Sequence, residues 1–305
     1  MTGGLRRLRR RETAKDEASA QSKGLGGHSR ASLLALPFSA YMLIFIAAPL
    51  ILIVLYSLCV DPPGDMAFTL EHFKRFFDFQ NPIYLQVLWR SFYIAVISTA
   101  ICLLIGYPMA YILSRMKPAT RNILSVLFIL PMWMNFLLRT YAWMSLLENT
   151  GLINTLLSTL GLPTINIMYT QWAVVLGNVY NFLPFMILPI YNVLVKIDPA
   201  VVEAAQDLGA SGRRVFTKVI LPLSIPGIVS GISMTFMPAI TTFVISKLLG
   251  GGQYTLIGDL IEKQYKVTGD WGFGSVMSVI IMVLILICMN LMPSSSKDNA
   301  GGGLL

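Results

Sequence analysis

Long runs of apolar residues, separated by shorter polar segments, dominate the sequence. A helix needs about 20 mostly apolar residues to cross the hydrocarbon core of a bilayer. Strands of a membrane barrel would alternate polar and apolar residues over about ten positions, whereas these runs are longer and do not alternate. The pattern therefore predicts an all-α integral membrane protein with six transmembrane helices, at residues 33–59, 91–114, 123–147, 171–195, 223–249 and 273–292.

The two ends of the chain differ in composition from the part between them. Residues 1–30 and 294–305 are rich in serine, glycine and charge. Such segments cannot bury enough apolar surface to fold, so we expect a disordered basic tail and a flexible tail. Residues 31–293 form one membrane domain. Its first apolar run exceeds the roughly 7–15 residues of a signal peptide's apolar part, so we expect it to be a retained helix.

The overall composition agrees with this reading. Charged residues make up only 12% of the 305 residues and hydrophobic residues 55%. Soluble domains carry roughly 25% charged residues. In a bilayer every backbone polar group must be satisfied within the protein, which helices achieve. The composition therefore argues against a soluble domain.

The net charge of +8 is distributed unevenly along the chain. With the amino terminus inside the cell, sixteen of the 23 basic residues fall in inside segments and four in outside loops, with three in the spans or at their ends. Basic residues concentrate in the cytoplasmic segments of membrane proteins. We therefore expect both termini to be cytoplasmic, and we attribute the charge to membrane orientation rather than to nucleic-acid binding.

Reactive side chains are few and scattered. The cysteines Cys59, Cys102 and Cys288 lie far apart within apolar runs, and the two histidines are isolated. Metal sites and disulfide frameworks require regularly spaced groups, so we expect no metal site and no catalytic residue. The predicted spans also hold no Asp or Glu well inside them, which disfavours a membrane-embedded enzyme. A channel stays as the other alternative from a different class.

The segment from residue 197 to 222, between the fourth and fifth predicted spans, carries helix signals on the predicted cytoplasmic side. Asp198 is suited to cap a helix whose first residue is Pro199. Gly209 is suited to the left-handed conformation that ends such a helix. Ser211 is then suited to cap a second helix. The segment predicts two short helices joined by a sharp turn at Gly209.

The same segment resembles the signature of permease subunits of bacterial ABC importers. The signature is Glu-Ala-Ala, three residues, Gly, nine residues, then an aliphatic residue, any residue and Leu-Pro. It falls here on Glu203, Ala204, Ala205, Gly209, Val219, Leu221 and Pro222. Asp207, Arg213 and Arg214 would add polar contacts. Val219 stands where isoleucine is most usual, which is a mild departure.

The resemblance implies a type I ABC importer permease in a bacterial plasma membrane. In that family this loop docks on an ATP-hydrolysing subunit, so the residues of the signature are the expected coupling residues. The chain itself contains no G-x-x-x-x-G-K-[ST] phosphate loop, so we expect it to bind no cofactor, with ATP and Mg on the partner. The family also implies two ATPase copies, a second homologous permease and an external substrate-binding protein. A channel would not need such a docking loop.

Further segments resemble the spermidine/putrescine permeases of the PotB type. They are residues 130–143, 151–154, 181–189, 243–251 and 270–274. Together they extend the resemblance over most of residues 30–292 and imply polyamine import. Permeases for iron(III), phosphonates or opines share parts of these segments and stay as the alternative.

A polyamine carries several positive charges, which are costly at the bilayer centre unless compensated. Aromatic faces can compensate through cation–π contacts. Candidates cluster in the third and fourth predicted spans: Trp133, Asn135, Tyr141, Trp143, Asn178, Tyr180 and Asn181. Their alternative role is packing or anchoring at the membrane interface.

Charged side chains near the outer face form a second group of candidates. Glu148, Asp259 and Glu262 would attract a cation, or would simply be solvated. Arg139 would repel a polyamine. Because it lies toward the outer end of the third predicted span, we expect it to snorkel or to pair with Glu148, in a structural or gating role.

Overall fold

The computed structural model describes residues 37–291, so the predicted tails, residues 33–36 of the first predicted span and residue 292 of the sixth lie outside the described part. The chain divides into two compact units, residues 1–55 and 56–305. In the first unit, one helix runs from Pro37 into α2 (Ala48–Tyr56) through η1 (Leu43–Ala47). Its apolar side chains are exposed all around, as expected of a helix in a bilayer. The first predicted span is confirmed over these residues.

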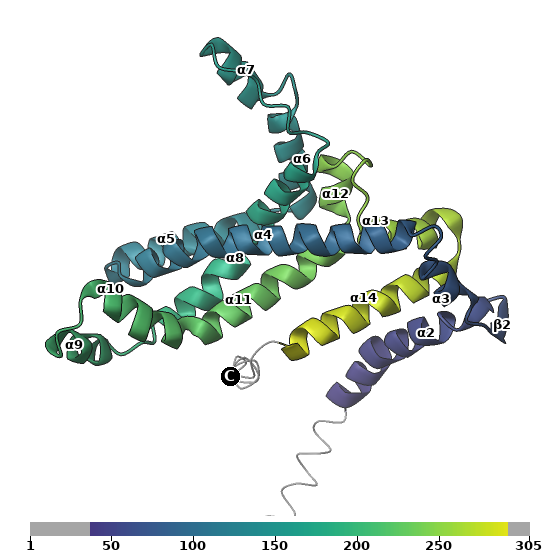
Figure 1. Ribbon diagram of the computed structural model, residues 1–305, viewed down its shortest axis with the longest axis horizontal. Coiled ribbons are helices and arrows are strands. Elements are labelled where there is room, and N and C mark those ends of the chain that lie inside the picture. Colours follow the sequence, from purple (N-terminus) through teal and green to yellow (C-terminus); the bar gives the residue numbers. More distant parts are fainter. Residues whose placement is uncertain (1–36, 292–305) are drawn as a thin grey trace, which may run out of the picture. The chain divides into compact units, whose positions relative to one another are not determined.

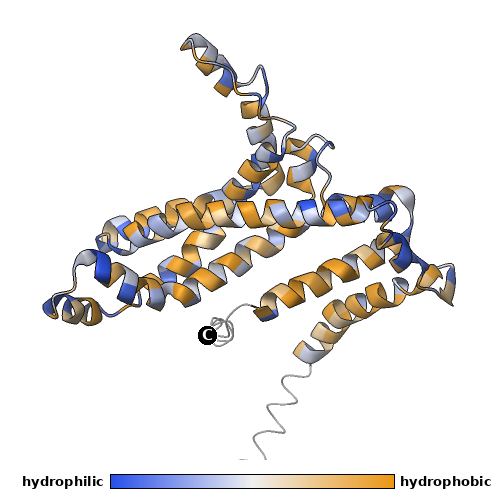
Figure 2. Ribbon diagram, in the orientation of Figure 1, coloured by the Kyte–Doolittle hydropathy of each residue, from blue (hydrophilic) through white to orange (hydrophobic). Residues whose placement is uncertain are grey.

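Three long helices form the core of the second unit: α4 (Ile83–Ser114), α8 (Gln171–Leu194) and α11 (Leu221–Thr241). They pack against one another in pairs, as Figure 1 shows. Small residues such as Ala95 and Ala239 lie fully buried in the same core as larger ones such as Met186 and Ile190. The outward faces of these helices are also apolar (Figure 2), which suits lipid as the surrounding solvent.

A close approach of backbones joins α8 to α11 at Gly227. A Cβ at this position would lie 2.9 Å from the carbonyl oxygen of Pro189 and 3.0 Å from the Cα of Ile190. Because both neighbours are backbone atoms, they cannot rotate away as a side chain can. Glycine at this position therefore sets the separation of the two helices, as small residues do in membrane helix pairs.

We expect Gly227→Ala to lower the stability of the folded chain by about 1–3 kcal/mol, because the helices must separate to admit the methyl group. The measurement is the thermal unfolding midpoint of the purified chain in detergent. Gly212→Ala is the matched control, since no atom lies within 4 Å of a Cβ there. Equal midpoints for the two variants would contradict the packing argument.

The last helix, α14 (Trp271–Leu291), packs in a smaller second core. Phe273 and Met277 of α14 contact Phe76 of α3 (Glu71–Phe76) and Ile257 of α13 (Ile257–Lys263) there. An antiparallel hairpin of β1 (Cys59–Asp61) and β2 (Asp65–Phe68) lies before α3. This hairpin, within an otherwise helical chain, was not expected from the apolar runs.

The third predicted span is not one helix. It consists of α5 (Pro118–Trp133) and α6 (Phe136–Leu147), followed by α7 (Leu152–Thr159), and the two halves meet at a bend of 91°. Met134 is extended at the bend, and the Asn135 side chain caps α6 by accepting the backbone N–H of Leu137 at 2.9 Å. The capping residue thus starts a new helix where the apolar pattern runs on unbroken. With this pair as one span, the described residues hold six spans.

The bounds predicted for the fifth span, residues 223–249, are also wrong. The helix begins at Gly212, through α10 (Gly212–Val215) and η2 (Phe216–Ile220), and ends at Thr241. Thr242 is extended, and the short helix α12 (Val244–Leu249) follows it. The predicted outer loop then contains α13 and η3 (Gln264–Thr268). Hydropathy alone predicts neither the extended residue Thr242 nor the start of the helix at Gly212.

Candidate functional site: the coupling loop and the aromatic cavity

The first half of the coupling loop folds as its sequence predicts. Helix α9 (Pro199–Asp207) begins after Asp198, whose carboxylate accepts the backbone N–H of Ala200 at 2.9 Å. Leu208 ends the helix, and Gly209 follows in the left-handed region with φ of +79°. Glycine adopts this conformation without the steric cost that other residues incur. The sharp turn at Gly209 is therefore present.

The second half differs from the prediction. Ser211 precedes α10 but makes no side-chain capping bond. Helix α10 continues without a break through η2 into α11, so the second element is the beginning of a membrane span and not a separate short helix. Val215 and Ile220 anchor it in the core, and Phe216 packs edge-on against Tyr107 and Tyr111 of α4. The loop thus joins a short helix, α9, to the beginning of a long one.

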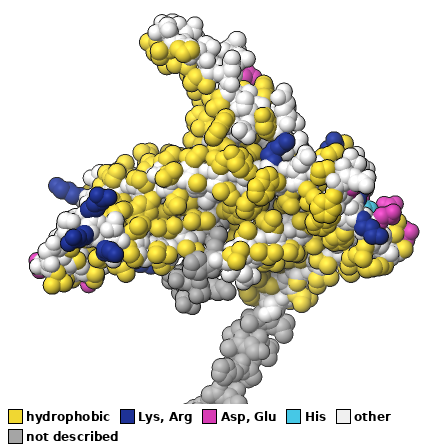
Figure 3. All heavy atoms as spheres, viewed as in Figure 1, with side chains coloured by type: hydrophobic (Ala, Val, Ile, Leu, Met, Phe, Trp, Pro, Cys, Tyr) yellow, Lys and Arg dark blue, Asp and Glu magenta, His cyan; other side chains and the backbone are white. Residues whose placement is uncertain are grey.

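The predicted coupling residues divide into an exposed and a less exposed set. Those exposed on α9 and α10 are Glu203, Ala204, Asp207, Arg213 and Arg214. Pro222 is exposed as well, whereas Ala205, Val219 and Leu221 are half-buried. Lys and Arg side chains gather over the same end of the molecule (Figure 3). The exposed set offers charges of both signs and a small residue to a partner.

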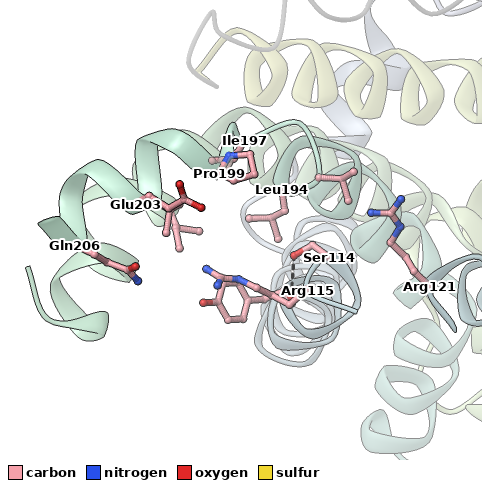
Figure 4. Close-up of a pocket in the computed structure, with 12 residues that line it drawn as sticks. Ser114, Arg115, Arg121, Leu194, Ile197, Pro199, Glu203 and Gln206 are labelled. Carbon is pink, nitrogen blue, oxygen red and sulfur yellow. Dashed lines mark hydrogen bonds between the residues drawn. The ribbon is translucent and has the colours of Figure 1, made fainter. Parts of the chain in front are cut away.

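A cavity of about 430 Å³ separates α9 from the ends of α4, α5 and α8. Figure 4 shows Glu203 and Gln206 on the α9 side and the Arg115 side chain extending toward them. Arg115 also lies over the Tyr111 ring, 5.0 Å from its centroid. The lining is mixed, because Leu194 and Val202 also face this cavity, and Val202 and Ala205 of α9 pack against the main core.

A second cavity, of about 240 Å³, lies between α6 and α8. Trp143 and Tyr180 meet edge-to-face there, with ring centroids 5.1 Å apart, and Arg139 lies beside them. Both aromatic residues were candidates for the substrate path. The structure brings these two candidates together.

The other path candidates do not line this cavity. Trp133 is 85% exposed, Tyr141 is exposed, and Asn135 is the cap of α6. Asn178 and Asn181 are buried between helices, where they donate to the Ser98 hydroxyl at 3.5 Å and the Gly177 carbonyl at 2.9 Å. The side-chain oxygens of both residues have no hydrogen-bond partner among the described residues, so both stay candidates for the substrate path.

Arg139 differs from its expected arrangement. It is only 8% exposed, and no ion pair joins it to Glu148 among the described residues. Glu148 instead ends α6, and its carbonyl accepts from the Asn154 side chain. The helix turns away at the Asn135 cap, which places Arg139 against α8 rather than at a free outer end. The predicted pairing with Glu148 is wrong.

The two remaining acidic candidates lie on α13 and line a cavity of about 370 Å³. Asp259 is buried and accepts the backbone N–H of Leu256 at 2.7 Å, and burial raises the pKa of its carboxyl group. Glu262 forms ion pairs with Lys247 of α12 and, at 3.1 Å, with Lys266. The hydrogen bond from Lys247 lowers the pKa of Glu262. Within residues 37–291, no three His, Cys, Asp or Glu side chains gather as a metal site.

Sequence reasoning missed the pairing of Lys247 with Glu262, because these residues lie 15 positions apart on two helices that were not expected. We expect Lys247→Gln to loosen α12 from α13, measured as faster hydrogen exchange of the α13 amides. In the unchanged chain, the lowered pKa of Glu262 keeps this ion pair at neutral pH, and it is lost as the pH falls through that pKa.

Lys266→Gln is the matched control for this prediction. Lys266 pairs with Glu262 within one helical stretch, and exposed pairs of this spacing contribute only about 0.3–0.5 kcal/mol. Exchange that rises equally in both variants would show that the link between the helices does not depend on Lys247.

Comparison with known families identifies the kind of protein. Residues 102–294, more than half of the chain, match the family described as binding-protein-dependent transport system inner membrane component. The chain belongs to this family. It is a multi-pass inner-membrane permease subunit of an ABC importer, and its role is transport rather than enzymatic catalysis.

Similar proteins cover nearly the whole permease. This chain is 39% identical over 259 residues to the spermidine/putrescine transport system permease protein PotB of Haemophilus influenzae. The alignment covers 83% of this chain and 89% of that protein. PotB of Escherichia coli K12 is 37% identical over 255 residues, covering 81% and 92%. A bacterial ABC transporter involved in alginate import has the same fold, with a TM-score of 0.75 at 16% identity over 92% of this chain and 99% of that one.

Proposed function

We propose that this permease carries polyamines of the spermidine and putrescine class into the cell. The observation that carries the proposal is the 37–39% identity, over more than four fifths of the chain, to relatives named spermidine/putrescine permeases. The alginate transporter supports the fold only, because its identity is 16%.

The chemistry of the described spans constrains how a polycation would cross. The five long helices between Pro37 and Leu291 contain no Asp or Glu. The edge-to-face pair of Trp143 and Tyr180 offers aromatic faces on which an ammonium group is stabilised by about 0.5–2 kcal/mol. Full compensation of several charges needs more than this, so part of the path belongs to another subunit.

The assembly that we propose follows from the coupling loop. Two ATPase subunits bind ATP and Mg and each docks on a permease, this chain through Glu203, Asp207, Arg213 and Arg214 around the Gly209 turn. A second homologous permease completes the path, and an external binding protein delivers the polyamine. The exposure of these charged residues around the Gly209 turn supports their role as a docking surface.

The proposed orientation places both termini and the coupling loop in the cytoplasm. The test uses a chain whose native cysteines are replaced by serine. We expect Asp207→Cys to react with a membrane-impermeant maleimide in inside-out vesicles of the inner membrane. It should not react in cells whose inner membrane is intact. Gly161→Cys, in the segment after α7, is the matched control and should show the reverse pattern. Labelling of Asp207→Cys from outside would show that the proposed orientation is the wrong way round.

The experiment that tests the cargo is uptake of labelled spermidine by cells expressing the complete importer. We expect putrescine in excess to compete and iron(III), phosphonates and opines not to compete. Competition by one of these other compounds, without competition by putrescine, would replace polyamines with that substrate while leaving the permease assignment in place.

A further inference from the structure

Arg139 carries a charge that nothing in the described chain compensates. It is 8% exposed, yet its Nε and Nη1 atoms find no hydrogen-bond partner within residues 37–291. An arginine side chain stays protonated in proteins, so it cannot become neutral as a buried lysine can. A buried charge without a counter-charge is strongly unfavourable. A counter-charge is therefore expected from outside this chain.

The cavity beside Arg139 has room for that counter-charge. Its volume is about 240 Å³, and no acidic residue lines it. Besides Arg139 its walls are Met134, Leu138, Ala142, Trp143, Leu146 and Tyr180. A carboxylate entering between these apolar and aromatic walls would be shielded from water, which strengthens its hydrogen bonds with the guanidinium group.

The surroundings of the cavity favour a protein partner over lipid. Trp133, Met134, Leu138 and Tyr141 are all exposed around the bend between α5 and α6. Figure 1 shows α6 leading away from the bundle of α4, α8 and α11, so residues 56–291 leave one flank of α6 uncovered. Arginine within a ring of Trp, Tyr and aliphatic residues is the composition of the energetic centre of protein interfaces. Lipid tails would offer the arginine no acceptor.

We propose that the companion permease of the importer docks on this elbow surface, defined as Trp133, Met134, Leu138, Arg139 and Tyr141, and inserts a carboxylate against Arg139. The inference rests on the proposed function only for the presence of a companion permease and not for the identity of the cargo. The test therefore measures assembly and stability rather than uptake, so a wrong polyamine assignment would leave its result unchanged.

The test compares Arg139→Gln with Arg139→Lys in the complete importer, purified through a tag on the ATPase. Removing one partner of a buried ion pair is strongly destabilising, so we expect Arg139→Gln to lower the thermal midpoint of the complex by about 5 °C or more. Arg139→Lys should keep most of the stability, because it keeps the charge. Lys263→Gln, at an exposed position of α13, is the matched control and should have no effect.

In the chain produced without the companion permease, the same Arg139→Gln substitution should not lower the thermal midpoint. There it removes an uncompensated charge, so the midpoint should stay equal or rise. In the assembled importer, a photo-crosslinking residue at Leu138 should label the companion permease. If Arg139→Gln destabilises the isolated chain as much as the complex, Arg139 serves packing within this chain and the proposal is overturned. Crosslinks to phospholipid alone, with a midpoint that follows the anionic lipid content, would overturn it as well.

Discussion

Gly209→Val is expected to reduce substrate uptake by about tenfold or more while leaving the permease in the membrane. The residue has φ of +79°, and no atom lies within 4 Å of a Cβ there. The substitution therefore acts through backbone conformation alone, at a cost of about 1–2 kcal/mol for a residue with a side chain in the left-handed region. The turn would open and move α9 away from the ATPase groove. The measurement is initial uptake rate in cells at matched permease levels.

Gly161→Val is the matched control for this substitution. Gly161 also has positive φ, +71°, with no atom within 4 Å of a Cβ, but it follows α7 on the opposite predicted side of the membrane. We expect it to leave uptake near normal. Glu203→Lys should reproduce the loss by reversing a charge on the docking surface. Normal uptake in both Gly209→Val and Glu203→Lys would remove the coupling role from this loop.

Replacing Trp143 and Tyr180 together by alanine is expected to produce the second large loss of polyamine uptake. The two rings meet at 5.1 Å and line the cavity that also holds Arg139. Removing both deletes the aromatic faces available to an ammonium group, each worth about 0.5–2 kcal/mol, so uptake should fall by about tenfold or more. The KM for delivered polyamine and the amount of assembled importer are measured side by side.

Trp172→Ala serves as the control for loss of an aromatic side chain. Trp172 is half exposed at the beginning of α8 and does not line the cavity. It should change uptake little. If the Trp143 and Tyr180 variant assembles normally and transports at the normal rate, these residues belong to packing and not to the path.

The part of the fold that depends on local signals could be predicted from the sequence. The cap at Asp198, the proline after it and the left-handed turn at Gly209 are each properties of one or two residues, and all are present. The apolar runs also located the spans, because a bilayer requires about 20 apolar residues whatever their packing.

Features that depend on contacts between distant segments could not be predicted in this way. The apolar run across residues 123–147 does not reveal the 91° bend, because a single Asn135 cap interrupts the helix without interrupting the hydropathy. The pairing of Trp143 with Tyr180 and the burial of Arg139 require α6 to lie against α8, which no local pattern encodes. The pairing of Lys247 with Glu262 likewise depends on where α12 and α13 meet.

The continuous helix from Gly212 to Thr241 connects the coupling loop to α13. Its 30 residues extend about 45 Å at 1.5 Å per residue, which exceeds the thickness of the hydrocarbon core. One end begins at the Gly209 turn, and the other meets α13, where Gly258 lies against the Thr241 carbonyl. A helix of this length that tilts by about 5° as one body moves its far end by about 4 Å. Under the proposed coupling role of the loop, movement of the ATPase would thus reach the cavity lined by α12 and α13 through this one helix.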